Sequence, residues 1–190
     1  MRGLMMDRPL LVSSLIEYAA DSFPDQPIIS KRVEGDIHRY DYRAARDRSA
    51  QLAQGLLDLG VKLGDRIATI AWNGYRHFEL YYAISGIGAI CHTINPRLFE
   101  DQLEYIVNHA GDRFLFIDTT FLPLVERMID KFPGLEAVIL LCDADKMPET
   151  TLPRVICYED LLSDKPPRFD WPEFDENVAA GLSNPTWGAG

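Results

Sequence analysis

The chain has 190 residues, enough for one or two domains of usual size, and it is 47% hydrophobic and 25% charged, as globular proteins are. Its 19 basic and 29 acidic residues give a formal net charge of −10 at pH 7. This composition argues against a mostly disordered chain. It also argues against DNA, RNA or an anionic membrane as a partner, because phosphate groups are bound by clustered positive charge.

The first 40 residues predict a helix followed by a β-hairpin. Apolar residues recur at helical spacing over residues 9–23, and Pro24 ends the helix because proline cannot continue the hydrogen-bond ladder. Two short runs, 28–33 and 37–40, flank Gly35, where glycine tolerates a positive φ. This arrangement is typical of a hairpin.

Between residues 41 and 141, amphipathic helices alternate with short apolar strands. Asp41 is suited to cap the first of these helices, and Gly60 is suited to end it. Asn73 is suited to cap the next helix. That helix is apolar nearly all round, so we expect it to be buried. Regular alternation predicts an α/β fold with a mostly parallel central sheet and helices on both faces. The expected helices are 41–59, 76–85, 100–110 and 121–132, and the expected strands are 67–71, 89–94, 113–117 and 136–141.

Two helical residues, Leu56 and Ile106, lie on apolar stripes and are expected to be fully buried. The pattern weakens in the last third of the chain. Residues 143–153 predict a polar loop, and the prolines of 165–172 exclude a helix. Residues 175–190 carry no strong pattern.

The cysteines and the apolar runs indicate the cellular compartment of the protein. Cys91, Cys142 and Cys157 form no C-x-x-C pair, so reduced thiols are expected rather than a disulfide framework or a zinc site. No apolar run approaches the roughly 20 residues of a membrane span, and the first residues lack the apolar core of a signal peptide. The sequence therefore predicts a cytoplasmic protein without a transmembrane segment.

Most candidate site residues have plain structural interpretations. Gly86 and Gly88 begin like a dinucleotide fingerprint, but the segment leads from helix into strand, so close packing of a helix end on a strand is favoured. His92 is either a structural histidine or part of a pocket wall. No histidine pair has metal-site spacing, and neither a nucleophile elbow nor a phosphate loop occurs in the sequence. We therefore expect no catalytic and no metal-binding residue.

One segment is a better candidate for binding. Asn95, Pro96 and Arg97 follow an expected strand and precede an expected helix. They should therefore lie at the carboxyl end of a strand, where open α/β sheets bind ligands. A turn stiffened by Pro96 is the alternative.

A string of segments in consistent order, from Leu10 to Leu182, resembles the AMP-forming acyl-CoA synthetases. These belong to the adenylate-forming superfamily, with luciferases and peptide-synthetase adenylation domains. The likeness is greatest to the medium- and long-chain fatty acyl branch. It rests on residues 41–43, 57–68, 72–73, 78–83, 87–90, 94–98 (Ile94-Asn95-Pro96-Arg97-Leu98), 103–106 and 114–118.

The resemblance implies part of the large domain of such an enzyme. The family joins a fatty acid to AMP, using ATP and Mg²⁺, and then transfers the acyl group to coenzyme A. Its catalytic groups lie downstream of the matched segments, so the resemblance implies no catalytic residue here, no cofactor for this chain alone, and no activity alone. It places Asn95, Pro96 and Arg97 near the coenzyme A entrance, where the guanidinium of Arg97 suits a phosphate.

The resemblance also implies a domain division. Residues 1–182 would be the N-terminal part of the synthetase domain, with a strand near 178–182 that leads into the phosphate loop. Residues 183–190 lack a lysine and the Ser/Thr/Gly cluster of that loop, so we expect an aberrant tail and a truncated synthetase that associates with its missing remainder. An isolated part should expose apolar surface and self-associate. Two alternatives remain: a non-catalytic module that docks on a synthetase, and an independent α/β ligand-binding protein.

Overall fold

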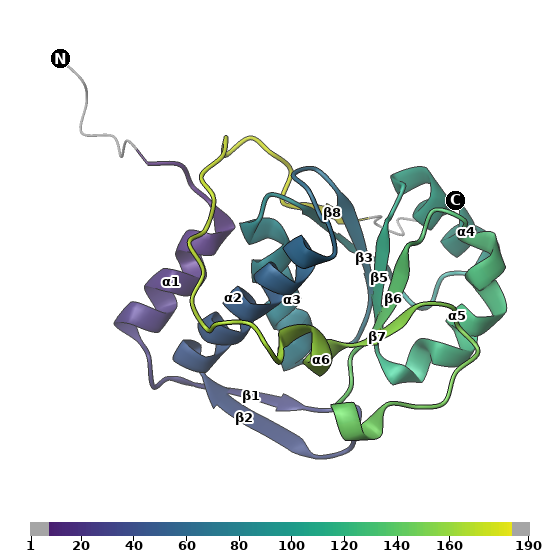
Figure 1. Ribbon diagram of the computed structural model, residues 1–190, viewed down its shortest axis with the longest axis horizontal. Helices are drawn as coiled ribbons and strands as arrows, with labels where there is room; N and C mark the ends of the chain where they lie inside the picture. The colour runs from purple at the N-terminus through teal and green to yellow at the C-terminus, as the bar shows by residue number, and fades with distance from the viewer. Residues whose placement is uncertain (1–7, 184–190) are drawn as a thin grey trace, which may run out of the picture.

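The computed structural model describes residues 8–183, in which a six-stranded sheet lies between two layers of helices (Figure 1). The strand order is β7-β6-β5-β3-β4-β8, and every neighbouring pair is parallel. The four strands expected from apolar runs share this sheet, which confirms the predicted architecture. The strands are β3 (Arg66–Ile70), β4 (Ile90–Thr93), β5 (Phe114–Ile117), β6 (Ala137–Leu140), β7 (Val155–Cys157) and β8 (Gly181–Ser183).

Helices cover both faces of the sheet, as predicted. On one face lie α2 and α3 with the short α6, and α1 packs outside α2 and α3; on the other face lie α4 and α5 (Figure 1). Residues 143–153 include a 3-10 turn, Ala144–Lys146, within the expected loop. The helices are α1 (Val12–Ser22), α2 (Tyr42–Asp58), α3 (Tyr75–Gly86), α4 (Glu100–Ala110), α5 (Leu122–Met128) and α6 (Tyr158–Leu162).

Strand alternation divides the hydrophobic core in two. Successive side chains of a strand point to opposite faces, so Phe114 and Phe116 of β5 enter the core beneath α2 and α3. Leu115 and Ile117 enter the core beneath α4 and α5. Because both faces are covered, β5 is buried along its whole length, which explains its continuous apolar run.

Local chemistry sets both ends of α2 as expected. The Asp41 carboxylate accepts a hydrogen bond from the Ala44 N–H at 2.8 Å, which caps α2. Gly60 follows α2 with φ +80°, a conformation that glycine adopts without strain. The expected Asn73 cap is wrong: Gly74 precedes α3 and no side chain caps it.

Three other expectations need correction. Ile106 is only half-buried, because Leu103 and Val107 form the inner stripe of α4 and Ile106 lies at its margin, whereas Leu56 is fully buried. Helix α3 is mostly buried, but Tyr81 is 43% exposed. The helix expected over 121–132 is a shorter α5 flanked by 3-10 turns.

The predicted N-terminal hairpin is present. Strands β1 (Pro27–Lys31) and β2 (Ile37–Asp41) pair antiparallel, and Gly35 in the connecting turn has φ +99°. The hairpin lies along the lower side of the molecule in Figure 1, below α2 and α6. Its turn reaches the carboxyl edge of the large sheet, where it lines a small cavity.

The segment between α6 and β8, residues 163–180, is here called the strap. It contains neither helix nor strand, as its prolines predict, and it runs over the helical layer to the edge of the sheet (yellow-green to yellow in Figure 1). The strap leads into β8, close to the strand that the resemblance implied. Ser183, assigned to the tail from sequence, is the last residue of β8, and residues 184–190 lie outside the described residues.

Candidate functional site

The sheet has a topological switch point between β3 and β5. These strands are neighbours, but the chain leaves β3 through α3 toward β4 on one side and leaves β5 through α5 toward β6 on the other. Ligands of open parallel sheets bind in the crevice that such a divergence creates at the carboxyl ends. Here Trp72 follows β3 and Asp118 follows β5, and the Trp72 N–H donates to Asp118 Oδ2 at 2.6 Å.

The crevice at this switch point is almost filled. It holds a cavity of about 30 Å³, which Trp72, Asp118, Arg76 and hairpin residues 31–34 line. That volume is close to the share of one water molecule in the liquid, whereas pockets for small organic ligands are typically about 300–1,000 Å³. The hairpin turn and Arg76 therefore leave no room for a nucleotide in this conformation.

Arg76 of α3 is the main side chain in the crevice. It is 5% exposed, and its guanidinium donates to Glu34 at 2.8 Å, to Glu159 at 2.9 Å and to the Leu141 carbonyl at 3.2 Å, with a further short ion pair to Asp143. These acceptors come from the hairpin, from α6 and from the loop after β6. Arg76 thus joins three segments to α3.

The same network continues into the helical layer. Glu79 is fully buried and accepts from Arg48 Nε at 2.8 Å and from the Tyr158 hydroxyl at 2.6 Å. Burial raises the pKa of Glu79, and the neighbouring Arg48 opposes that shift. Arg48 also donates to Glu159. Because both oxygens of the Glu79 carboxylate accept hydrogen bonds from side chains of the protein, Glu79 has a structural role.

This network was not predicted from the sequence. Its signal was available: Arg76 and Glu79 lie in a helix whose other residues are mostly apolar, and charged side chains on a buried helix require partners. The partners could not be named, because Arg48 and Glu159 are 111 residues apart in the sequence.

Asp118 is a buried carboxylate at the switch point. Burial raises its pKa to about 6, and the hydrogen bond from Trp72 opposes the shift. His77 lies nearby on α3 with its Nε2 3.1 Å from Thr69 Oγ1, and burial lowers its pKa. Asp118 could therefore exchange a proton near neutral pH, but the cavity beside it is too small for an organic substrate.

The Asn95, Pro96 and Arg97 segment lies at the carboxyl end of β4, as expected. Asn95 Oδ1 accepts from the Arg97 N–H at 3.0 Å, so the segment is also the turn proposed as the alternative. The Arg97 side chain is exposed and, within residues 8–183, forms no ion pair. None of these three residues lines the cavity in the crevice.

The other candidates are structural. His92 is fully buried, with Nδ1 2.8 Å from Asp112 Oδ2, so it is not part of a pocket wall. Gly86 and Gly88 are in close packing, but against Trp171, Phe174 and Leu63 rather than against a strand as predicted.

Magnesium does not fit the described part of the chain, and ATP does not fit the crevice at the switch point. In residues 8–183, no three His, Cys, Asp or Glu side chains are grouped so that they could share a metal ion, and the crevice is too small for ATP. In the same residues, no helix is long and apolar enough to span a bilayer.

Comparison with known proteins identifies the family. The AMP-binding enzyme family matches residues 16–176. A 3-methylmercaptopropionyl-CoA ligase of Ruegeria lacuscaerulensis is 42% identical over 182 residues, which cover 96% of this chain and 34% of that protein. A medium-chain-fatty-acid–CoA ligase of Ectopseudomonas oleovorans is 39% identical, with 96% and 33% covered.

The fold agrees with this match. The crystal structure of a long-chain-fatty-acid-CoA ligase from Archaeoglobus fulgidus superimposes with a TM-score of 0.78 at 16% identity, over 94% of this chain and 35% of that one. The chain spans about a third of the length of the curated relatives it matches. Since the family match covers most of its residues, this chain belongs to the AMP-binding enzyme family.

Proposed function

We propose that this chain is the N-terminal part of an acyl-CoA ligase for medium- or long-chain fatty acids, and that it is inactive alone. The observation that carries the proposal is the identity of 39–42% over nearly the whole chain to relatives named as CoA ligases. One of these relatives is named for a medium-chain fatty acid, which supports that substrate class. The whole enzyme would use ATP, Mg²⁺, coenzyme A and a fatty acid.

Inactivity alone is supported by the site itself. The cavity in the crevice at the switch point has a volume of about 30 Å³, and hairpin residues 31–34 form part of its lining. Adenylyl transfer requires donors and a metal placed around the phosphates, and the described residues contain no group of His, Cys, Asp or Glu side chains that could hold the metal. We therefore assign ATP binding to the remainder of the ligase, with which residues 1–182 would associate in the cytoplasm.

Arg97 is proposed to lie at the coenzyme A entrance, together with Asn95 and Pro96. Its guanidinium is exposed, lacks an ion pair among the described residues and is held beside a turn at the carboxyl end of β4. Planar donor forks of this kind bind phosphate oxygens with two parallel hydrogen bonds. Coenzyme A offers such oxygens in its diphosphate and ribose phosphate.

A fusion tests the proposal. Residues 1–182 of this chain would replace the matched third of the Ectopseudomonas ligase, and ATP–pyrophosphate exchange would be measured with a series of straight-chain fatty acids. Controls are this chain alone, the relative's remainder alone and the two unfused parts mixed. We expect exchange by the fusion and none by the chain alone.

Two results would contradict the proposal. One is a folded, soluble fusion that shows no exchange with any acid of the series. The other is an ATP–Mg²⁺ dissociation constant in the micromolar range, about −8 kcal/mol, for this chain alone in a calorimetric titration. The second result would require an ATP site in the chain itself and would favour the independent ligand-binding alternative.

A further inference from the structure

The strap touches the rest of the molecule at a few points only. Its half-buried positions are Lys165, Phe169, Trp171, Phe174 and Val178, and its other residues are exposed. Between Leu162 and Gly181 no helix or strand holds it. The course of the strap therefore depends on these contact points, together with hydrogen bonds such as those that the Gln51 and Gln54 amides donate to the carbonyls of Lys165 and Pro166.

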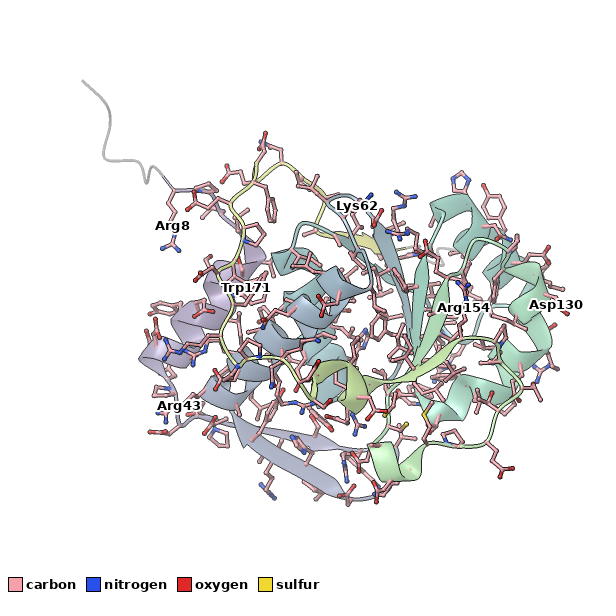
Figure 2. All side chains as sticks on the ribbon, in the orientation of Figure 1. Arg8, Arg43, Lys62, Asp130, Arg154 and Trp171 are labelled. Atoms are coloured by element: carbon pink, nitrogen blue, oxygen red, sulfur yellow. The ribbon has the colours of Figure 1, made fainter. Side chains whose placement is uncertain are left out.

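Trp171 makes the most specific of these contacts. Figure 2 labels it where the strap crosses the helical layer beside α1. Its indole Nε1 donates to Glu17 Oε1 of α1 at 2.8 Å, and its ring forms an edge contact with Phe169 at 5.1 Å between centroids. The ring also packs against the core beneath α2 and α3.

The ring lies directly over Gly86, the last residue of α3. A Cβ atom at position 86 would come within 2.4 Å of the Trp171 ring, a distance that real Cβ contacts do not show. Gly86 does not have a positive φ, so its backbone alone would accept alanine. The absence of a side chain at Gly86 thus leaves the space that the Trp171 ring occupies.

The edge strand β8 begins ten residues after Trp171, at Gly181. The strap's last residue, Ala180, accepts hydrogen bonds from the Ser85 hydroxyl at 2.8 Å and from the Cys91 N–H at 3.1 Å. The three residues of β8 are themselves exposed and pair only with β4. Because the side chains of β8 bury so little surface, the position of β8 depends on the course of the strap that precedes it.

We propose that Trp171, seated on Gly86, is a positioning residue that fixes β8 at the edge of the sheet. It thereby fixes the direction in which the chain leaves the sheet. The last described residue, Ser183, pairs with Thr93, two residues before Asn95, so the chain leaves beside the proposed coenzyme A segment. The effect on catalysis, but not the effect on β8, rests on the proposed ligase function.

Hydrogen exchange on this chain tests the role in positioning. We expect Trp171→Ala and Gly86→Ala each to lower the protection of residues 178–183 and of the Cys91 amide by about tenfold or more, with the amides of β5 unchanged. The double variant Gly86→Ala with Trp171→Ala should show no greater loss of protection than Trp171→Ala alone, because the Cβ added at position 86 then has no Trp171 ring to clash with. Tyr105→Ala, which removes an exposed aromatic ring from α4, is the control.

Three outcomes would overturn the inference. They are unchanged protection of β8 in Trp171→Ala, equal loss of protection in β5, which would indicate general destabilisation, and a full additional effect of Gly86→Ala in the Trp171→Ala background. None of these results depends on ligase activity, so they remain interpretable if the proposed function fails.

The fusion adds a catalytic readout. We expect Trp171→Ala to lower kcat of the fusion by about tenfold with KM for the fatty acid unchanged, because misplacing groups that come after β8 affects positioning rather than acid binding. Trp171→Phe, which keeps a ring over Gly86, should restore most of kcat. An unchanged kcat in Trp171→Ala would contradict the catalytic part of the inference, whereas an inactive parent fusion would contradict the proposed function.

Discussion

Arg76 shows how single buried charges shape the candidate site. Its guanidinium lies among oxygens of Glu34, Asp143 and Glu159, and it fills the crevice where related topologies bind ligands. A buried cation is tolerated only when paired, and removing it would leave Glu34 without its ion-pair partner, whereas Asp143 and Glu159 would keep Arg32 and Arg48. The same contacts that close the crevice therefore also hold the hairpin to the sheet.

Asp118 should make stability depend on pH. Its folded pKa of about 6 lies above its ordinary value of 3.8, so the folded state binds a proton more readily than the unfolded state does. Stability should therefore fall as pH rises from 3.8 through about 6. Asp118→Asn removes the buried charge, and we expect it to stabilise the chain by roughly 2–3 kcal/mol near pH 8 and hardly at all near pH 4.

Urea unfolding at both pH values measures this difference. Glu149→Gln is a suitable control, since Glu149 is an exposed carboxylate that does not line the crevice. Equal stabilisation by Asp118→Asn at both pH values would show that the buried charge is not the cause.

Arg97 should act on coenzyme A. In the fusion, we expect Arg97→Gln to raise KM for coenzyme A by roughly 10-fold, since a charge-assisted hydrogen bond to phosphate contributes about 1.5–3 kcal/mol. The KM for ATP should not change. Arg127→Gln, which alters an exposed arginine on α5, is the matched control. A similar KM for coenzyme A in both variants would contradict the placement of Arg97 at the coenzyme A entrance.

At the scale of elements, packing against the sheet decides stability more than helix pattern does. Leu56 of α2 is fully buried, whereas Ile106 of α4 is half-buried. We expect Leu56→Ala to cost roughly 2–5 kcal/mol of unfolding free energy and Ile106→Ala clearly less, about 1 kcal/mol. Denaturant unfolding of the two variants gives the comparison, and equal losses would contradict the burial assignment.

The sequence predicted the elements that have strong local signals. Buried parallel strands such as β5 are continuous apolar runs, and Asp41 and Gly60 mark helix ends by their own chemistry. The short β7 and α6 were missed, because three to five residues carry too little periodicity. Closure of the crevice could not be predicted, since it brings Glu34 and Asp143 of distant segments onto Arg76.

At the scale of the whole molecule, the outer surface is unusually apolar in places. The outer side of α1 and its flanks expose Leu10, Leu15, Tyr18 and Phe23, each by more than half. Neighbouring exposed apolar side chains of this kind mark interfaces or sites of aggregation. A part of a larger enzyme would cover such a surface with the remainder.

We therefore expect self-association despite the net charge of −10. Sedimentation velocity at micromolar concentration should show species larger than the monomer, and Leu15→Glu together with Tyr18→Glu should reduce them. Substituting exposed residues on another face, for example Tyr105→Glu, should have less effect. A native chain that is a clean monomer with a sharp two-state melt would instead favour an independent module.

We propose that these residues form the N-terminal part of a fatty acyl-CoA ligase. The most direct measurement is product formation by the fusion of residues 1–182 to the remainder of the Ectopseudomonas ligase, detected by mass spectrometry. With ATP, Mg²⁺, coenzyme A and a medium-chain fatty acid, we expect the acyl-CoA thioester and AMP from the fusion and neither from the chain alone. A folded fusion that forms no thioester, or a chain that forms it unaided, would contradict the claim.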